Sequence, residues 1–232
     1  MTTPVVLLPS LGRGASDFDA LVDALHAAGF EALALEPPDA VPDGATLHDL
    51  AEVVVAAMDA RGWPRVHLVG HALGQRLSRC VVADHPDRVV SLTMLCAGGL
   101  VEMEPHIARS LIASFDESLS AEQHLEHVRS VFFADGNDPA VWAAGWLPAT
   151  AAGQRAAVRA TPPGEWTSAA AERVLVVQGL QDACAVPENG RLYVAMHPDI
   201  ATLVEIDGAG HALLPEQPAA VATVVIGFLR GE

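Results

Sequence analysis

His211 follows a predicted strand near the end of the chain, and Asp182 follows the predicted strand before it. An aspartate beside a histidine fixes the tautomer of the imidazole, which can then act as a general base and afterwards as a general acid. In an open parallel sheet, sites form outside the carboxyl ends of the strands, so we expect the two residues to meet there. The pair therefore predicts proton-transfer chemistry at one edge of a sheet.

A third loop, residues 70–74, reads Gly-His-Ala-Leu-Gly between a predicted strand and a predicted helix. A tight strand-to-helix turn needs small residues at its first and fifth positions, and it pushes the central side chain out at the edge of the sheet. This is the nucleophile elbow, usually Gly-x-Ser-x-Gly. Its centre here is Ala72, whose methyl group cannot attack a carbonyl. The chain order of elbow, Asp182 and His211 predicts a catalytic triad with alanine at the nucleophile position.

The elements that must position these loops are short apolar runs alternating with helical patterns. The runs are mostly apolar throughout, which suits parallel strands buried on both faces. The alternation predicts the α/β class, with a doubly wound, mostly parallel six-stranded sheet. The predicted strands are Val5–Leu8, Ala32–Leu35, Val66–Val69, Val90–Cys96, Val174–Val177 and Thr202–Ile206.

Local signals mark the ends of two predicted helices. Ser16 is a candidate N-cap and Gly29 a candidate stop for the first helix. Thr46 is a candidate N-cap for the second helix, and Gly62 is expected to end it.

One region breaks the alternation, because residues 100–171 separate the fourth and fifth predicted strands. This is far more chain than a bare crossover needs. The region reads as helical over 107–115, 121–133 and 151–160, and it holds three of the four tryptophans. We therefore predict a helical cap insertion at 100–171 on a core made of 1–99 and 172–232.

Composition narrows the class of protein. The chain has 232 residues, 51% hydrophobic and 18% charged, which argues against disorder. A net charge of −16 disfavours nucleic-acid and membrane-surface partners. Three cysteines without CxxC spacing, no basic leader before the first apolar run and no apolar run near 18 residues predict a cytoplasmic location.

With these loops the sequence resembles the α/β-hydrolase superfamily, specifically its small esterase, lactonase and haloperoxidase-like members. The segment Leu-Leu-Pro-Ser-Leu-Gly at residues 7–12 matches the family's first oxyanion loop, although the family usually has His-Gly at 9–10. The family also has two strands before the oxyanion strand, which here begins at Val5. The resemblance implies an oxyanion hole formed by the backbone N–H groups of Leu11 and Leu73.

The resemblance further implies hydrolysis of a carboxylic ester or lactone, with no metal and no organic cofactor. Expected partners are a small-molecule ester or lactone, with a homodimer left open. The expected catalytic positions are Ala72, Asp182 and His211. Expected substrate-binding residues are Ser10, His71, Trp142 and Trp146.

Ala72 admits three interpretations. We expect the chain to be a Ser→Ala variant of an active hydrolase; the alternatives are a natural enzyme of this fold that needs no nucleophile and a relative that only binds ligand. For the second interpretation, the elbow is similar to that of the aminoacrylate hydrolase of pyrimidine degradation, and cofactor-free dioxygenases of this fold also depend on a His–Asp pair. Two assignments also stay open: Glu102, after the preceding strand, is a rival for the triad acid, and Cys184 is read as packing rather than as a nucleophile.

Overall fold

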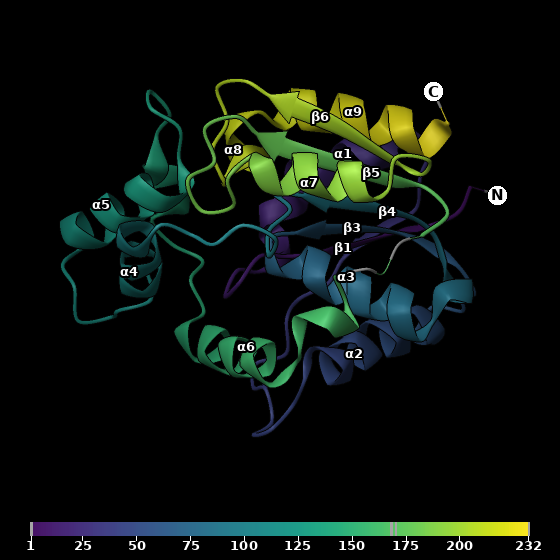
Figure 1. The fold of residues 1–232 in the computed structure, drawn as a ribbon, viewed down its shortest axis with the longest axis horizontal. Helices are drawn as coiled ribbons and strands as arrows, with labels where there is room; N and C mark the ends of the chain where they lie inside the picture. The colour runs from purple at the N-terminus through teal and green to yellow at the C-terminus, as the bar shows by residue number, and fades with distance from the viewer. Residues whose placement is uncertain (1, 168, 170, 232) are drawn as a thin grey trace.

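Six strands form one parallel sheet in the order β2-β1-β3-β4-β5-β6 in the computed structural model, which describes residues 2–167, 169 and 171–231 (Figure 1). The predicted fold class is confirmed. The strands are β1 (Val5–Leu8), β2 (Ala32–Ala34), β3 (Val66–His71), β4 (Val89–Leu95), β5 (Val174–Gly179) and β6 (Ala201–Ile206).

Two strands extend further than their apolar runs predicted. β3 continues through His71, which pairs with Leu95, and β5 continues through Gln178, which pairs with Glu205. Hydrophobicity stops at the polar residue, but ladder pairing does not, since the backbone hydrogen bonds are independent of the side chain. The buried ends of β3 and β5 therefore carry polar side chains directly to the edge of the sheet.

Helices cover both faces of the sheet (Figure 1). α1 and α9 pack on one face around Phe18, Leu25 and Val225, whereas α2, α3 and α7 pack on the other. The helices are α1 (Asp19–Ala27), α2 (Leu47–Ala60), α3 (Leu73–Asp84), α4 (Pro105–Ala113), α5 (Ala121–Phe132), α6 (Pro148–Ala160), α7 (Glu188–Met196), α8 (Leu213–Glu216) and α9 (Pro218–Arg230), with 3₁₀ turns η1 (Ala15–Phe18), η2 (Pro86–Arg88), η3 (Pro139–Trp142) and η4 (Pro163–Glu165).

Three of the four predicted helix ends are confirmed. Thr46 caps α2 in a capping box with Asp49, and Gly29 and Gly62 follow α1 and α2 with φ of +88° and +68°. The N-cap prediction at Ser16 is wrong. Ser16 lies inside η1, so α1 begins three residues later, at Asp19, without a side-chain cap.

The segment between β4 and β5 contains α4, α5 and α6. In Figure 1, α4 and α5 lie beyond the carboxyl ends of the strands, and α6 lies beside α2. α4 and α5 share a small core of their own that includes Ile107, Val128 and Phe132. No helix in the described part of the chain is long and apolar enough to cross a membrane.

The strand order reverses between β1 and β3, so the loops after these two strands leave the sheet side by side. Ligands bind at such a switch point in open α/β sheets. The approach is close: a Cβ on Gly74, at the start of α3, would lie 2.0 Å from the Leu8 carbonyl oxygen at the end of β1. The fold thus joins the loop after β1 to the turn after β3.

Candidate active site

Ala72 lies in a strained turn between β3 and α3. Its φ of 50° and ψ of −105° fall in a region that non-glycine residues avoid, at a cost of about 1–3 kcal/mol. Gly70 and Gly74 make the turn possible, because a Cβ on Gly70 would lie 2.4 Å from backbone atoms of Gly74 and Gln75. The backbone therefore has the form of a nucleophile elbow, and it presents a methyl group to a cavity.

Asp182 and His211 meet at the carboxyl ends of β5 and β6. His211 Nδ1 and Asp182 Oδ2 are 2.8 Å apart, and both residues are buried, at 3% and 2% exposure. The other carboxylate oxygen, Asp182 Oδ1, accepts hydrogen bonds from the backbone N–H groups of Cys184 (2.9 Å) and Ala185 (2.7 Å). The loop after β5 thus fixes the carboxylate, and the carboxylate fixes the imidazole.

The charge of Asp182 determines the basicity of His211. Burial by itself lowers the pKa of His211, but the adjacent Asp182 carboxylate, assisted by the Cys184 side chain, raises it well above its ordinary 6.5. Nδ1 is engaged by Asp182, so Nε2 is the ring nitrogen free to exchange a proton. His211 can therefore act as a proton acceptor, and the fraction of its unprotonated form increases as the pH rises.

His71 is hydrogen-bonded to the backbone of His211. The His71 side chain is fully buried, and its Nε2 donates to the His211 carbonyl oxygen at 2.8 Å. Burial lowers the pKa of His71 to about 3, so the ring is neutral. His71 does not line the cavity, contrary to its expected place among substrate-binding residues, because β3 continues through it and directs its side chain into the core.

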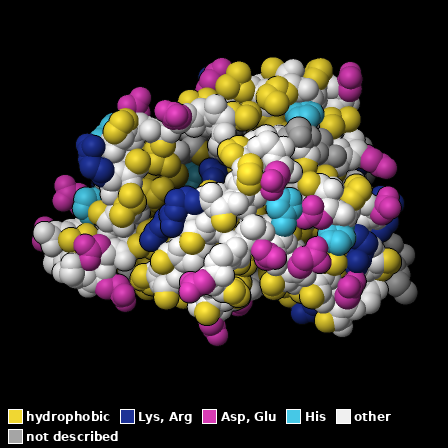
Figure 2. Space-filling view, turned by 60° about the horizontal axis from the view of Figure 1, so that its bottom comes forward, with side chains coloured by type: hydrophobic (Ala, Val, Ile, Leu, Met, Phe, Trp, Pro, Cys, Tyr) yellow, Lys and Arg dark blue, Asp and Glu magenta, His cyan; other side chains and the backbone are white. Residues whose placement is uncertain are grey.

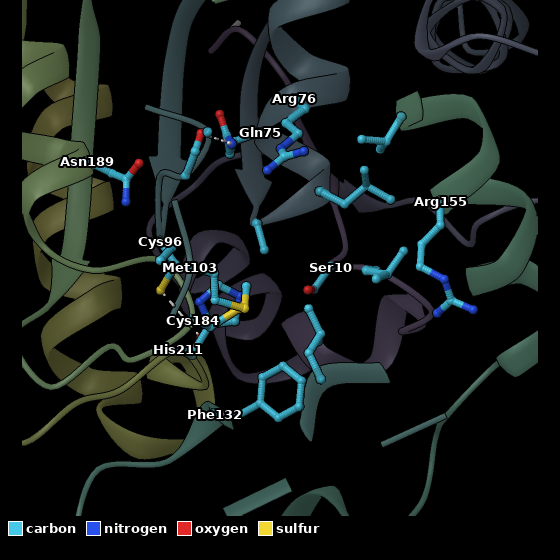
Figure 3. Close-up of a pocket in the computed structure, with 18 of the residues that line it drawn as sticks. Ser10, Gln75, Arg76, Cys96, Met103, Phe132, Arg155, Cys184, Asn189 and His211 are labelled. Carbon is cyan, nitrogen blue, oxygen red and sulfur yellow. Dashed lines mark hydrogen bonds between the residues drawn. The ribbon is translucent and has the colours of Figure 1, made fainter. Parts of the chain in front are cut away.

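A cavity of about 500 Å³ opens in front of the elbow (Figure 3). Of the expected substrate-binding residues, Ser10 and Trp146 line it, and Ser10 points inward in Figure 3. Trp142 does not line it. Trp142 is only 3% exposed, and its ring packs against the rings of Phe132 and Phe133. Residues that line the cavity from the β4–β5 segment include Leu111, Phe132, Trp146 and Arg155.

Two residues that line this cavity have backbone N–H groups without an acceptor in the described part of the chain. Leu73 is the first residue of α3, so its N–H has no partner within the helix. Among the described residues, neither the Leu11 N–H nor the Leu73 N–H makes a hydrogen bond, and both residues line the cavity. Two such N–H groups can donate hydrogen bonds to an oxyanion and stabilise its charge.

Other side chains near His211 have distinct places. Glu102 is exposed at the cavity wall, whereas Asp182 makes the contact with the imidazole. Cys184 lines the cavity, and its side chain helps to raise the pKa of His211. His71, Cys96 and His211 each offer a metal-ligating atom within 4.8 Å of the others. Hydrogen bonds already link this group, since the Cys96 thiol and His71 Nε2 both donate to the His211 carbonyl.

The sequence interpretation missed the arginines of the cavity wall, among them Arg76 and Arg155. Arg76 could have been predicted from the sequence, because it is the fourth residue of α3, the helix that begins directly after Ala72. Arg155 could not have been, since the position of α6 relative to the sheet depends on tertiary packing.

A parallel sheet with an elbow, a buried Asp–His pair and two amides without acceptors among the described residues are the features expected of an α/β-hydrolase site. The chain belongs to the alpha/beta hydrolase family, whose sequence model matches residues 5–224. It is a member of a family of hydrolytic enzymes.

Particular relatives can be named. The chain is 25% identical over 211 residues to the protein named "Putative carbamate hydrolase RutD" from Caulobacter vibrioides, covering 82% of this chain and 75% of that one. It is 36% identical over 99 residues to the protein of the same name from Variovorax paradoxus, a match that spans 40% of this chain and 37% of that one.

Solved structures are similar along almost the whole chain. A hydrolase from Pseudomonas aeruginosa PA01 superposes with a TM-score of 0.78 at 25% identity, covering 98% of this chain and 90% of that one. A thermophilic esterase from Thermogutta terrifontis superposes with a TM-score of 0.76 at 21% identity, covering 100% and 90%. At that identity the esterase shows the fold alone.

Proposed function

We propose that this chain hydrolyses the acyl bond of a carboxylic ester, lactone or carbamate, with His211 activating a water molecule. The observation that carries the proposal is the intact His211–Asp182 pair beside an elbow that presents only the methyl group of Ala72. The ester and lactone part rests on the resemblance of the motifs. The carbamate part rests on the name of relatives that match over 82% of the chain.

The reaction begins with water between His211 Nε2 and the substrate carbonyl. The water oxygen forms a bond to the carbonyl carbon while Nε2 takes one of its protons. The carbonyl oxygen becomes an oxyanion that accepts hydrogen bonds from the N–H groups of Leu11 and Leu73, each worth about 3–4 kcal/mol in comparable sites. Collapse of this intermediate breaks the bond to the leaving group, which takes the proton from the imidazolium.

Asp182 makes this proton transfer possible. The carboxylate accepts from Nδ1–H, which leaves the lone pair on Nε2, and it stabilises the imidazolium after the proton has moved. The raised pKa of His211 means that the base form increases as the pH rises above 6.5. The rate of hydrolysis should therefore increase with pH over that range.

A second candidate is a serine hydrolase in which Ala72 replaces the nucleophile. The strained φ of 50° at Ala72 favours it, because this backbone form holds a central side chain toward the substrate. A non-catalytic binding protein is the third interpretation of the same site. All three predict a ligand in the same cavity, so activity assays must separate them.

We also propose that residues 100–171 act as a cap on a core formed by 1–99 and 172–232. Support comes from the cavity wall, to which Leu111, Phe132 and Trp146 of this segment contribute beside Ser10 of the core. On this proposal the segment sets substrate specificity, and the core sets the chemistry.

The test compares the wild-type chain with Ala72→Ser and His211→Gln on matched aryl esters, lactones and carbamates. We expect turnover by the wild type and its loss in His211→Gln. An inactive wild type beside an active Ala72→Ser variant that shows a burst of product would overturn the water mechanism in favour of the serine hydrolase. No turnover by any of the three would favour the binding protein.

A further inference from the structure

Three arginines line the cavity from two helices: Arg76 on α3, and Arg155 and Arg159 on α6. Basic residues are scarce in this chain, with 13 Lys and Arg against 29 Asp and Glu. In Figure 2, basic side chains border the hollow near the centre of that face, while acidic side chains are spread over the rest of it. The cavity wall therefore carries positive charge although the chain as a whole is strongly negative.

Among the described residues, these three arginines differ from Arg13 in having no acidic partner. Arg13, which also lines the cavity, is neutralised by Asp17 through hydrogen bonds of 2.9 and 2.6 Å. Within the described part of the chain, Arg76, Arg155 and Arg159 have no carboxylate within ion-pair distance. Their guanidinium groups are available to a ligand.

The Arg76 guanidinium lies against an aromatic ring and close to the backbone of Gly99. Its guanidinium lies 5.2 Å from the centre of the Trp166 ring, and its Nη2 lies 3.8 Å from where a Cβ on Gly99 would be. Burial lowers the pKa of Arg76, because the charge has lost water without gaining a carboxylate. Arginine nonetheless stays protonated in proteins, so the site keeps its positive charge.

Arg155 shows the same deficit on the other wall. Its Nη1 is buried without a hydrogen-bond partner among the residues that the structure describes, and its guanidinium lies 5.2 Å from the Phe115 ring. Arg159 lies one helical turn further on, and two like charges at this spacing destabilise a helix. A bound anion would relieve the repulsion and supply the missing acceptor.

We propose that the substrate carries a carboxylate besides its scissile acyl bond, that Arg76 binds this carboxylate directly, and that Arg155 on the opposite wall attracts it through its positive charge. The guanidinium fork matches a carboxylate in two parallel hydrogen bonds. Arg76 lies in the first turn of α3, directly after the elbow at Ala72, and both residues line the same cavity. We therefore expect a short acyl chain to join the scissile bond to the carboxylate. This inference rests on the hydrolase function proposed above.

A pair of unreactive ligands tests the anchor without requiring turnover. 5-Oxohexanoate carries a ketone and a carboxylate, and 2-hexanone is its neutral counterpart. Isothermal titration calorimetry should show the wild type binding 5-oxohexanoate about 10- to 100-fold more tightly than 2-hexanone, with affinity falling as salt is added. Arg76→Gln and Arg155→Gln should each remove about tenfold of that preference and leave the affinity for 2-hexanone unchanged.

Two further variants control for damage to the fold. Arg76→Lys keeps the charge but loses the fork, so its preference should fall between those of the wild type and Arg76→Gln. Arg61→Gln removes an exposed arginine outside the cavity wall and should bind both ligands as the wild type does. Thermal unfolding midpoints of all variants establish that the binding differences arise in folded protein.

Hydrolysis of mono-4-nitrophenyl glutarate and 4-nitrophenyl pentanoate separates this inference from the proposed function. We expect the wild type to favour the glutarate, and both arginine variants to lose that preference. Equal binding of 5-oxohexanoate and 2-hexanone, or hydrolysis of both esters at equal rates, overturns the anchor while hydrolase activity stands. Arginine-dependent binding of 5-oxohexanoate without hydrolysis of either ester overturns the hydrolase function and leaves the anchor supported.

Discussion

Replacing Asp182 by asparagine changes the proton arrangement of the site with almost no change in shape. The backbone N–H groups of Cys184 and Ala185 donate to Oδ1, so the oxygen of the introduced amide must stay at that position. Its NH₂ group then takes the place of Oδ2 and faces His211 Nδ1 as a donor. Nδ1 must become the acceptor, and the ring proton moves to Nε2.

The wrong tautomer cannot accept a proton from water through Nε2. The same substitution lowers kcat about 10⁴-fold in a serine protease triad, which corresponds to about 5.4 kcal/mol of barrier at 1.36 kcal/mol per tenfold. We expect a loss of this order for Asp182→Asn. The NH₂ group would also face Gln178 Nε2, which now donates to Oδ2 at 3.1 Å, so the variant should lose about 1–3 kcal/mol of stability as well.

The assay is kcat/KM from pH 5 to 10 for the wild type and Asp182→Asn, with urea unfolding of both. The wild-type profile should rise through an inflection well above pH 6.5, because the Asp182 carboxylate raises the pKa of His211. Any residual activity of the variant should have its inflection at lower pH. If Asp182→Asn keeps activity within about tenfold of the wild type and the same inflection, the orienting role of Asp182 is refuted.

Three further predictions address the elbow, the ion pair and the thiol. Gly74→Ala should lose about 3 kcal/mol of unfolding free energy in urea, since its Cβ would lie 2.0 Å from the Leu8 carbonyl oxygen. The control is Gly164→Ala, where a Cβ meets nothing within 4 Å, and equal stabilities of the two variants would contradict the close approach. The raised pKa of His211 stabilises the fold fully below pH 6.5, and that contribution should be lost as the pH rises through the folded-state pKa. Urea unfolding at several pH values should show this loss in the wild type and a flatter dependence in Asp182→Asn. A free energy of unfolding that rises over this range would contradict the ion pair. Cys184→Ser should keep the hydrolytic activity and shift the activity profile to lower pH, because the Cys184 side chain helps to raise the pKa of His211; loss of activity would instead make the thiol the nucleophile.

The sheet could be predicted because its signals are local. Runs of apolar residues and the loops after them identify strands without any knowledge of their neighbours, and the positions of Asp182 and His211 followed from strand ends. The elbow was legible for the same reason. A Cβ on Gly70 would meet backbone atoms of Gly74 and Gln75, a few residues away, so the need for a small residue there is visible in the spacing. Gly74 instead makes room for the distant Leu8 at the end of β1.

The rest depends on packing between distant segments. Ser16 has the right residue type for an N-cap, but the preceding chain winds into a 3₁₀ turn that delays α1. His71 is adjacent to Ala72 in the sequence, and Trp142 belongs to the segment that contributes to the cavity wall, yet both side chains are buried in packed cores. Arg155 reaches the cavity only because α6 lies beside α2. Sequence patterns name the residues that could act, and tertiary contacts decide which way they face.

The central claim is that His211 activates water in a site whose elbow carries alanine. The measurement that tests it most directly is kcat/KM of the wild type and of His211→Gln on one ester at a pH above the His211 inflection. We predict turnover by the wild type and a fall of about 10²–10⁴-fold in the variant. Wild-type turnover that does not depend on His211, or none at all beside an active Ala72→Ser variant, would contradict the account.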